Sequence, residues 1–370
     1  MTRVVRVDDR VPREERRRAL AEAGRRLRAG ELVAFPTETV YGLGADATNP
    51  AAVRRIFAAK GRPADNPLIV HIEQVERLRE VAATIPGPAL ELAGLFWPGP
   101  LTLVLPRRDT ICPEVSAGLP TVAVRCPEHP VARELIAFAD RPVAAPSANL
   151  SGRPSPTRAE HVLRDLGGRI PLLLDGGPCR VGVESTVLDL TSRPPVLLRP
   201  GGVTLEELRS VLGRVDLDPG VLGEPHSGPV RSPGMKYRHY APAAPAWLVE
   251  GTPPAVARKV FQLVKEWAGA GERVGLLISE ETAQQLGELL SADLPGGGGT
   301  LQVEVVGPRD HPEEYARRLF ALLRRLDEAG ASRILMEGVP PVGMGLAVAN
   351  RLRRAAGHQV IKAEPGGAPE

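Results

Sequence analysis

Residues 60–72 contain two segments, Lys60-Gly61-Arg62-Pro63 and Leu68-Ile69-Val70-His71-Ile72, which together indicate an α/β fold. The second segment predicts a buried strand, because it is a short and almost wholly apolar run. A helix is predicted before the first segment, because Asn49-Pro50 is an N-cap followed by a proline in the first turn. Loops at strand edges carry the ligand-binding groups of α/β proteins, so the two cations stand where an anion would bind.

Lys60 is the only lysine before residue 236, in a chain that has 47 lysines and arginines. Arginine supplies positive charge by default in such a chain. This lysine therefore indicates a position that needs a compact ammonium rather than a planar guanidinium. The alternative is a solvated surface lysine, the usual environment of this residue type.

Apolar runs on both sides of this stretch predict further strands and helices up to residue 212. Residues 14–29 predict an amphipathic helix whose arginines form a solvated face. Thr204 and Glu207 form a capping box for a short helix that ends at Leu212. The other predicted strands cover 32–35, 101–105, 121–125, 142–145, 185–190 and 196–198, and the other helices 74–83, 87–95, 130–138 and 158–166.

From residue 246 onward strands and helices alternate regularly, which predicts a parallel sheet with helices on both faces. Gly343-Met344-Gly345 resembles part of a dinucleotide-binding fingerprint, but it lacks the third glycine and lies near the end of the chain. Helix packing is therefore the preferred interpretation of these glycines. Strands are predicted at 246–249, 273–278, 301–306, 333–337 and 359–362, and helices at 255–268, 280–290, 312–329 and 346–356.

Residues 213–245 are rich in glycine and proline and predict a linker that is long for a compact protein. This linker contains Ser232-Pro233-Gly234-Met235-Lys236-Tyr237-Arg238-His239-Tyr240-Ala241-Pro242, whose tyrosines and histidine are unusual for a solvated segment. We therefore expect it to dock on another part of the chain. The predicted domains cover 1–212, the linker 213–245 and a smaller domain 246–370.

The composition is that of an ordinary globular protein, with 43% hydrophobic and 25% charged residues among 370. The net charge of +3 is mildly basic, and the 4% aromatic content argues against a platform for single-stranded nucleic acid. Three cysteines without metal-like spacing predict a reducing cytoplasm. We expect no signal peptide and no membrane span, because no suitable apolar segment occurs.

Two segments combine small residues with hydroxyl and amide groups. Pro36-Thr37-Glu38-Thr39-Val40-Tyr41-Gly42-Leu43-Gly44 suits a small polar ligand, although a tight turn with capping hydroxyls fits the same pattern. Ala144-Ala145-Pro146-Ser147-Ala148-Asn149-Leu150-Ser151-Gly152 follows a predicted strand. Ser147 and Asn149 would share one face of it and hold an anion, and an Asx turn is the alternative.

Arginines at the ends of strands indicate two further anion contacts. Thr121 and Arg125 share a face of one predicted strand, and an arginine there can bind a carboxylate with two hydrogen bonds. Arg199 ends another strand before two glycines, which favours a phosphate. A lone histidine on a strand is more often a core residue than a ligand, but His71 follows the cationic loop directly.

In this order the segments resemble one family, the YrdC-like threonylcarbamoyl-AMP synthases, over about residues 14–362. Phe96-Trp97-Pro98-Gly99-Pro100-Leu101-Thr102 and the Ser232–Pro242 string add to the resemblance. The linker and a C-terminal α/β domain resemble the long, two-domain form, the latter by layout more than by residues. The fold implied is a YrdC-like twisted mixed sheet flanked by helices, with a smaller Rossmann-like parallel-sheet domain.

The resemblance implies that the chain makes threonylcarbamoyl-AMP from L-threonine, bicarbonate or CO2, and ATP, with release of pyrophosphate. Mg2+ would come bound to the ATP phosphates, and no side chain is expected to be a dedicated metal ligand. The product would pass to the machinery that modifies the adenosine next to the anticodon of tRNA in the cytoplasm. RNA contact would be weak, and no membrane partner is expected.

The resemblance also implies three sets of site residues. The catalytic set is Lys60, Arg62, Ser147 and Asn149. The L-threonine set is Thr39, His71, Arg125, Ala145 and Ser185. The ATP set is Arg62, Asn66, Thr121, Ser147, Ser155, Arg199 and Tyr240, with Tyr237 as the competitor of Tyr240.

An RNA-binding, translation-associated module is the alternative function, in which a basic cleft would hold RNA phosphates. The small net charge and the few aromatic residues argue against it. A dinucleotide-binding C-terminal domain is the second alternative, and it depends on the incomplete glycine pattern at residues 343–345 alone.

Overall fold

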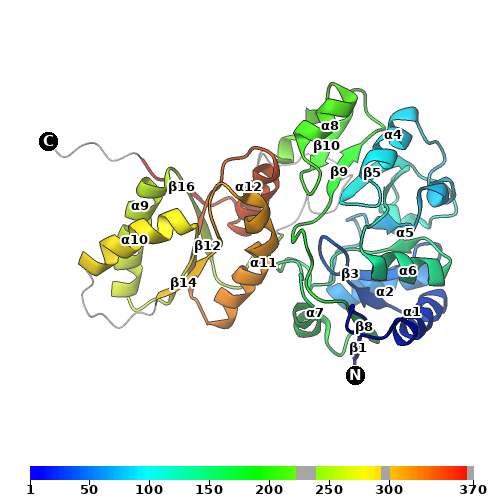
Figure 1. Ribbon diagram of the computed structural model, residues 1–370, viewed down its shortest axis with the longest axis horizontal. Helices are drawn as coiled ribbons and strands as arrows, with labels where there is room; N and C mark the ends of the chain where they lie inside the picture. The colour runs from blue at the N-terminus through cyan, green and yellow to red at the C-terminus, as the bar shows by residue number, and fades with distance from the viewer. Residues whose placement is uncertain (222–238, 293–300, 365–370) are drawn as a thin grey trace. The chain divides into compact units, whose positions relative to one another are not determined.

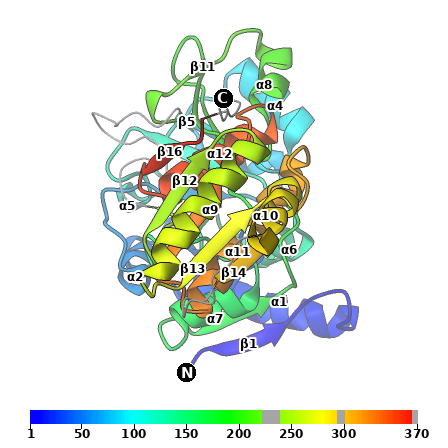
Figure 2. The same ribbon diagram turned by 90° about the vertical axis from the view of Figure 1, so that its left-hand side faces the viewer.

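The computed structural model describes residues 1–221, 239–292 and 301–364, drawn as ribbons in Figures 1 and 2. The chain forms two compact units. The first contains Met1–Ser151 and Ser155–Tyr237, and the second contains Gly152–Pro154 and Arg238–Glu370. Each unit is α/β, as the sequence predicts.

The first unit is built on one mixed sheet, whose described strands follow the order β1-β8-β2-β3-β7-β4-β6-β5-β9-β10-β11. Its strands are β1 (Arg3–Arg6), β2 (Val33–Phe35), β3 (Gly42–Asp46), β4 (Ile69–His71), β5 (Leu101–Pro106), β6 (Thr121–Arg125), β7 (Val143–Ala144), β8 (Leu172–Asp175), β9 (Thr186–Asp189), β10 (Val196–Arg199) and β11 (Asp216–Leu217). Its helices are α1 (Arg13–Arg28), α2 (Pro50–Lys60), α3 (Leu78–Val81), α4 (Gly87–Phe96), α5 (Pro113–Ser116), α6 (Pro130–Ala139), α7 (Ala159–Leu166) and α8 (Leu205–Leu212), with short 3-10 turns at Val75–Arg77 and Pro219–Val221.

The middle of this sheet joins segments that are far apart in the sequence. Strand β4 pairs in parallel with β6, so that His71 lies opposite Arg125. On its other side β4 pairs antiparallel with β7, which places His71 opposite Val143. Strand β7 in turn pairs with β3, the strand that follows the Thr-rich segment. These pairings place β3, β7, β4 and β6 side by side in the sheet.

One face of the sheet is covered by α1 and α6, which lie side by side (Figure 1). Leu20 and Leu27 of α1 and Leu135 of α6 are fully buried with Phe35 of β2. Burying four such side chains contributes roughly 6–12 kcal/mol of hydrophobic stabilisation. Gly24 permits this packing, because a Cβ at that position would lie 2.6 Å from the carbonyl carbon of Phe138.

The second unit is a parallel sheet in the order β14-β13-β15-β12-β16. Helices α9 and α10 cover one face and α11 and α12 the other, as both views show (Figures 1 and 2). Its strands are β12 (Ala246–Glu250), β13 (Val274–Ile278), β14 (Leu301–Val305), β15 (Arg333–Glu337) and β16 (Val360–Lys362), and its helices α9 (Pro253–Gly269), α10 (Glu280–Ala292), α11 (Pro312–Glu328) and α12 (Met344–Ala355).

The glycines before α12 have a local structural use. Gly343 caps the helix with a φ of 55°, a left-handed conformation that favours glycine. A Cβ at Gly345 would overlap the carbonyl oxygen of Pro340. Tight packing at the start of α12 therefore accounts for both glycines, in agreement with the preferred interpretation of the sequence.

The predicted elements are confirmed, and the structure adds strands that the pattern did not predict. Strand β3 contains Gly42 and Gly44, which are poor strand formers, and it forms because β2 and β7 hold it on both sides. Strand β11 lies within residues 213–245 and pairs with β10, while Val215 and Val221 beside it are buried. Most of the predicted linker, residues 222–238, lies outside the described residues. In the described part of the chain, every helix is too short or too polar to cross a membrane.

Candidate functional site

Lys60 is the last residue of α2 and is only 2% exposed. Asn49 begins this helix by accepting hydrogen bonds from the N–H groups of Ala51 and Ala52, and Gly61 ends it in the left-handed conformation. The Nζ of Lys60 donates to the carbonyl oxygens of Ser147 and Asn149, the latter at 2.6 Å. The alternative of a solvated surface lysine is therefore wrong.

Burial lowers the pKa of Lys60 well below its usual value, and the charge of Arg62 lowers it further, while Asp165 acts in the opposite direction. An ammonium has three N–H donors, and the two carbonyl oxygens use two of them. Lys60 thus ties the segment after β7 to the end of α2 and keeps one donor for another partner.

Arg62 and Asn66 lie in the loop between α2 and β4. The guanidinium of Arg62 donates to the carbonyl oxygen of Asn66 at 3.3 Å and to that of Pro67 at 3.0 Å. Both side chains are buried. The Oδ1 atom of Asn66 has no hydrogen-bond partner within residues 1–221, 239–292 and 301–364. A buried acceptor of this kind is usually satisfied by water or a ligand.

Arg125 at the end of β6 meets the Thr-rich segment that follows β2. Its Nη1 donates to Thr39 Oγ1 at 2.9 Å, its Nη2 forms an ion pair with Glu38 Oε1 at 2.5 Å, and its Nε donates to the carbonyl of Gly99 at 3.2 Å. A guanidinium has five N–H donors, so one remains on each terminal nitrogen as far as the described residues go. That pair of donors matches the two oxygens of a carboxylate.

Glu38 was part of the quoted segment but was not predicted as a site residue. Burial raises the pKa of its carboxyl group, the charge and hydrogen bond of Arg125 lower it, and the net shift is downward. Glu38 is therefore a carboxylate at neutral pH. Its partner Arg125 is 87 residues away in the sequence, so no local pattern could have identified the pair.

His71 lies beside Arg125 in the sheet register and is a buried, neutral side chain. Burial, and to a lesser extent the charge of Arg125, lower its pKa to about 3, against a smaller opposing effect of Glu38. Its ring meets the edge of Phe35, with ring centroids 6.4 Å apart. Its Nδ1 is buried and has no hydrogen-bond partner in the described part of the chain.

The segment after β7 is fixed by its backbone. The N–H of Ala145 donates to the carbonyl oxygen of Ile69, and the N–H of Ala148 donates to that of Tyr41. Ser147 is bridged to Gly42 and is half-buried, and the Nδ2 of Asn149 donates to the carbonyl of Leu150 at 2.7 Å. Ser147 and Asn149 therefore lie on the segment that Lys60 holds.

A second group of hydroxyls lies around the start of β9. Ser185 and Thr102 share a hydrogen bond of 2.8 Å between their hydroxyls, and Arg199 donates to both the hydroxyl and the carbonyl of Ser185. Gly201 allows the chain to pass close by, because a Cβ there would overlap the backbone of residues 184–186. Thr102 was quoted in a motif but was not predicted as a site residue.

Ser155 and Thr121 also belong to the predicted ATP set. The hydroxyl of Ser155 donates to the carboxylate of the buried Glu184. Thr121 begins β6, opposite Pro106 of β5, and is partly exposed.

Tyr240 belongs to the second unit. Its ring stacks on Phe320 with centroids 5.3 Å apart, and Arg351 lies over it at 5.5 Å. Its competitor Tyr237 lies outside the described residues, so the choice between them stays a prediction.

The three cysteines are poor candidates for a catalytic nucleophile. Cys112, Cys126 and Cys179 are free and buried, and burial raises the pKa of the Cys126 thiol to about 11. A thiol of that kind is protonated at neutral pH and is a poor nucleophile. The described residues contain no group of three or more His, Cys, Asp or Glu side chains that could hold a metal ion.

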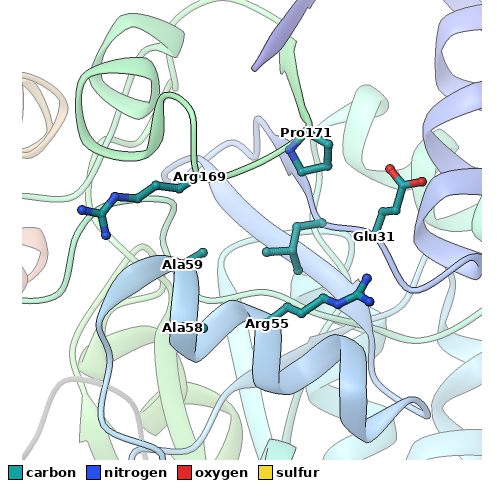
Figure 3. Close-up of a pocket in the computed structure, with 7 residues that line it drawn as sticks. Glu31, Arg55, Ala58, Ala59, Arg169 and Pro171 are labelled. Carbon is teal, nitrogen blue, oxygen red and sulfur yellow. The ribbon is translucent and has the colours of Figure 1, made fainter. Parts of the chain in front are cut away.

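A separate pocket of about 520 Å3 lies on the outer side of α2. Figure 3 shows Arg55, Ala58 and Ala59 along α2, with Arg169 and Pro171 across from them, and the guanidinium groups of Arg55 and Arg169 pointing in opposite directions. None of the predicted site residues lines it, so it is distinct from the group around Lys60 and Arg125.

Comparison with known proteins covers both units. A family model described as telomere recombination matches residues 25–201, and one described as the C-terminal domain of threonylcarbamoyl-AMP synthase matches residues 203–357. The threonylcarbamoyl-AMP synthase of Pyrococcus abyssi is 51% identical over 336 residues, which are 91% of this chain and 93% of the relative. That of Bacillus subtilis is 49% identical over 344 residues, 93% of this chain and 94% of the relative.

Solved structures agree with these relatives. The crystal structure of P. abyssi Sua5 complexed with L-threonine has a TM-score of 0.89 and 48% identity, covering 98% of this chain and all of that one. A variant of P. abyssi Sua5 with an adjacent histidine and tyrosine replaced by alanine has a TM-score of 0.88 and 46% identity, with full coverage of both chains. Since the likeness extends over both units at about half identity, the chain belongs to the threonylcarbamoyl-AMP synthase family.

Proposed function

We propose that this chain makes threonylcarbamoyl-AMP from L-threonine, bicarbonate or CO2, and ATP, and releases pyrophosphate. The observation that carries the proposal is the 51% identity to a threonylcarbamoyl-AMP synthase over 91% of the chain. The buried cations Lys60, Arg62 and Arg125 support it, because the α-carboxylate of the amino acid, the N-carboxylate intermediate and the nucleotide phosphates are all anionic.

The reaction joins two anions. The α-ammonium of threonine loses a proton, and the free amine takes up CO2 to give an N-carboxylate with release of a second proton to solvent or, with bicarbonate, to the hydroxide that leaves as water. This carboxylate attacks the α-phosphorus of ATP while pyrophosphate leaves. With bicarbonate as the carbon source, one water is released as well. The site must reduce the repulsion between carboxylate and phosphate and align them, which is electrostatic and positional catalysis. No protein nucleophile is required.

Lys60 would serve this step in two ways. Its two hydrogen bonds to the carbonyl oxygens of residues 147 and 149 would position Ser147 and Asn149, and its third N–H and its charge would serve the reacting anions. Burial alone disfavours the charged lysine, and an anion beside it favours the charged form again. Ser147 and Asn149 would donate hydrogen bonds to carboxylate or phosphate oxygens without adding charge.

The threonine set has a consistent local chemistry. The two remaining donors of Arg125 suit the α-carboxylate, and Thr39, Ser185 and the neutral His71 supply hydrogen-bonding groups for the rest of the molecule. The N–H of Ala145 donates a hydrogen bond to the carbonyl oxygen of Ile69, in the same strand as His71.

ATP is proposed to bind to Arg62, Asn66, Thr121, Ser147, Ser155 and Arg199. Arg199 ends β10 before two glycines, and the unpartnered Oδ1 of the buried Asn66 is an acceptor that a nucleotide could satisfy. Mg2+ is proposed to come with the ATP phosphates, since this ion is usually bound by substrate phosphates and few protein ligands. When bound, it would neutralise part of the phosphate charge.

The linker is proposed to close the site. Its central residues, 222–238, lie outside the described part, and the proposal rests on His239 and Tyr240. These two form the adjacent His-Tyr pair of this chain, and an adjacent histidine and tyrosine are replaced in the P. abyssi variant. A lid would protect the mixed anhydride from water.

The product is proposed to supply the threonylcarbamoyl group for the tRNA adenosine next to the anticodon, in the cytoplasm. A mixed anhydride of a carbamate and a phosphate is an activated acyl donor, so a downstream acyltransferase must consume it. The family assignment favours this role over the RNA-binding alternative.

A pyrophosphate-release assay tests the proposal. The full chain is incubated with ATP, Mg2+ and bicarbonate, and each amino acid is added in turn. Release that depends on L-threonine is the expected result. Release that is independent of the amino acid, or salt-sensitive RNA binding without any release, would contradict it.

A further inference from the structure

Glu38 has a buried carboxylate of which only one oxygen is satisfied. Its Oε1 pairs with Arg125 Nη2 at 2.5 Å, and the side chain is 3% exposed. Its Oε2 is buried and has no partner at hydrogen-bond geometry in residues 1–221, 239–292 and 301–364, although the backbone N–H groups of Glu38 and Glu128 also stabilise the carboxylate and lower its pKa. A buried charged oxygen without a partner is costly, which indicates that a cation or donor other than the described residues completes it.

The surroundings of this oxygen identify the chemistry of the missing group. Arg125 keeps one N–H on each terminal nitrogen, directly beside the carboxylate that Glu38 presents. A cation partner and an anion partner next to each other match the two charges of an amino acid, whose carboxylate and ammonium are attached to one carbon. The other predicted threonine contacts, Thr39, His71 and Ser185, are neutral groups.

We propose that Glu38 binds the α-ammonium of L-threonine while Arg125 binds its α-carboxylate. This rests on the proposed function, in which L-threonine is the substrate. Glu38 is then a specificity-determining residue: it selects an amino acid over the corresponding hydroxy acid, and it orients the nitrogen that later takes up CO2. Glu184, another buried carboxylate of the first unit, already accepts a hydrogen bond from Ser155, so it is the weaker candidate.

The test compares two ligands on the full chain. Calorimetry measures the Kd of L-threonine and of its analogue (2S,3R)-2,3-dihydroxybutanoate, in which a hydroxyl replaces the α-ammonium. Glu38→Gln should weaken L-threonine at least about tenfold and change the analogue little, because a buried charge-assisted hydrogen bond is lost only with the first ligand. Glu38→Asp keeps the charge and should retain the preference for the amino acid.

Glu337→Gln is the matched control. Glu337 also forms an ion pair with an arginine, the partly buried Arg309, at 3.2 Å. The Glu337 side chain is fully buried, but Glu337 belongs to the second unit. The Glu337→Gln substitution should lower the melting temperature without changing the ratio of the Kd values of the two ligands. If Glu38→Gln weakens both ligands alike, or neither, the residue is only a structural partner of Arg125 and the inference fails.

The same data separate this inference from the proposed function. If wild-type protein does not bind L-threonine, the threonine site itself is wrong. If wild type binds it and Arg125→Ala abolishes binding of both ligands, the site stands and the Glu38 comparison decides the inference alone. Should Glu38→Gln fail to fold, Glu38→Asp gives the comparison, and an equal loss for both ligands in that variant overturns the inference.

Discussion

Replacing Lys60 by Arg keeps the charge of the site and changes only the shape of the head group. Lys60 is 2% exposed, and its Nζ donates to the carbonyl oxygens of residues 147 and 149. A planar guanidinium is larger and cannot place one nitrogen between two carbonyl oxygens in the same way. Losing one charge-assisted hydrogen bond costs about 1.5–3 kcal/mol, and overpacking a buried site adds about 1–3 kcal/mol.

Part of this cost falls on stability and part on catalysis. We expect kcat/KM for pyrophosphate release to fall at least tenfold, which corresponds to ~1.4 kcal/mol of transition-state stabilisation. Lys265→Arg, at an exposed position of the second unit, is the control and should leave the rate unchanged. The unfolding midpoint is measured in parallel. Wild-type turnover in a folded Lys60→Arg protein would refute the reasoning, because charge alone would then be sufficient.

Three further predictions test other parts of the site. Burial lowers the pKa of His71 to about 3, below its unfolded value near 6.5, so the contribution of the neutral ring to stability is full above pH 6.5 and is lost as the pH falls toward 3. Between pH 7.5 and 5.0, wild type should therefore lose about 2 kcal/mol more free energy of unfolding in urea than His71→Phe, and equal losses would contradict this. Gly201→Ala should lose activity about tenfold, because the new Cβ overlaps the backbone at Ser185, whereas Gly94→Ala, with open space around it, should not; full activity of the first would count against the tight turn. Replacing both His239 and Tyr240 by Ala should reduce product formation about tenfold if the linker is a lid, and undiminished formation would defeat that role.

Local patterns predicted the elements whose start or period is set by neighbouring residues. Asn49 and Pro50 predict the start of α2, and the cap forms as expected, because the Asn49 side chain accepts two backbone hydrogen bonds. The capping box of Thr204 and Glu207 is likewise present. By contrast, β3 contains two glycines, and the sequence predicts a ligand-binding segment or a tight turn there rather than a strand. It becomes a strand only because β2 and β7 supply its hydrogen bonds.

The contacts between the predicted site residues could not be predicted from local sequence patterns. The sequence singled out Lys60 and Arg125 by residue type and position. It did not predict that Lys60 would hold the segment of Ser147 and Asn149, because those contacts span 87 and 89 residues. It missed Glu38 for the same reason. Ion pairs between distant segments depend on the strand order of the sheet, which local periodicity does not determine.

The most direct test is to detect the product itself. The full chain is incubated with L-threonine, ATP, Mg2+ and isotopically labelled bicarbonate, and the mixture is analysed by mass spectrometry under conditions that limit hydrolysis. If ammonium, guanidinium and hydroxyl groups of one buried site join these reactants, labelled threonylcarbamoyl-AMP forms with wild type and not with Arg125→Ala. Absence of the labelled adenylate with wild type, or its equal formation by both proteins, would contradict the account.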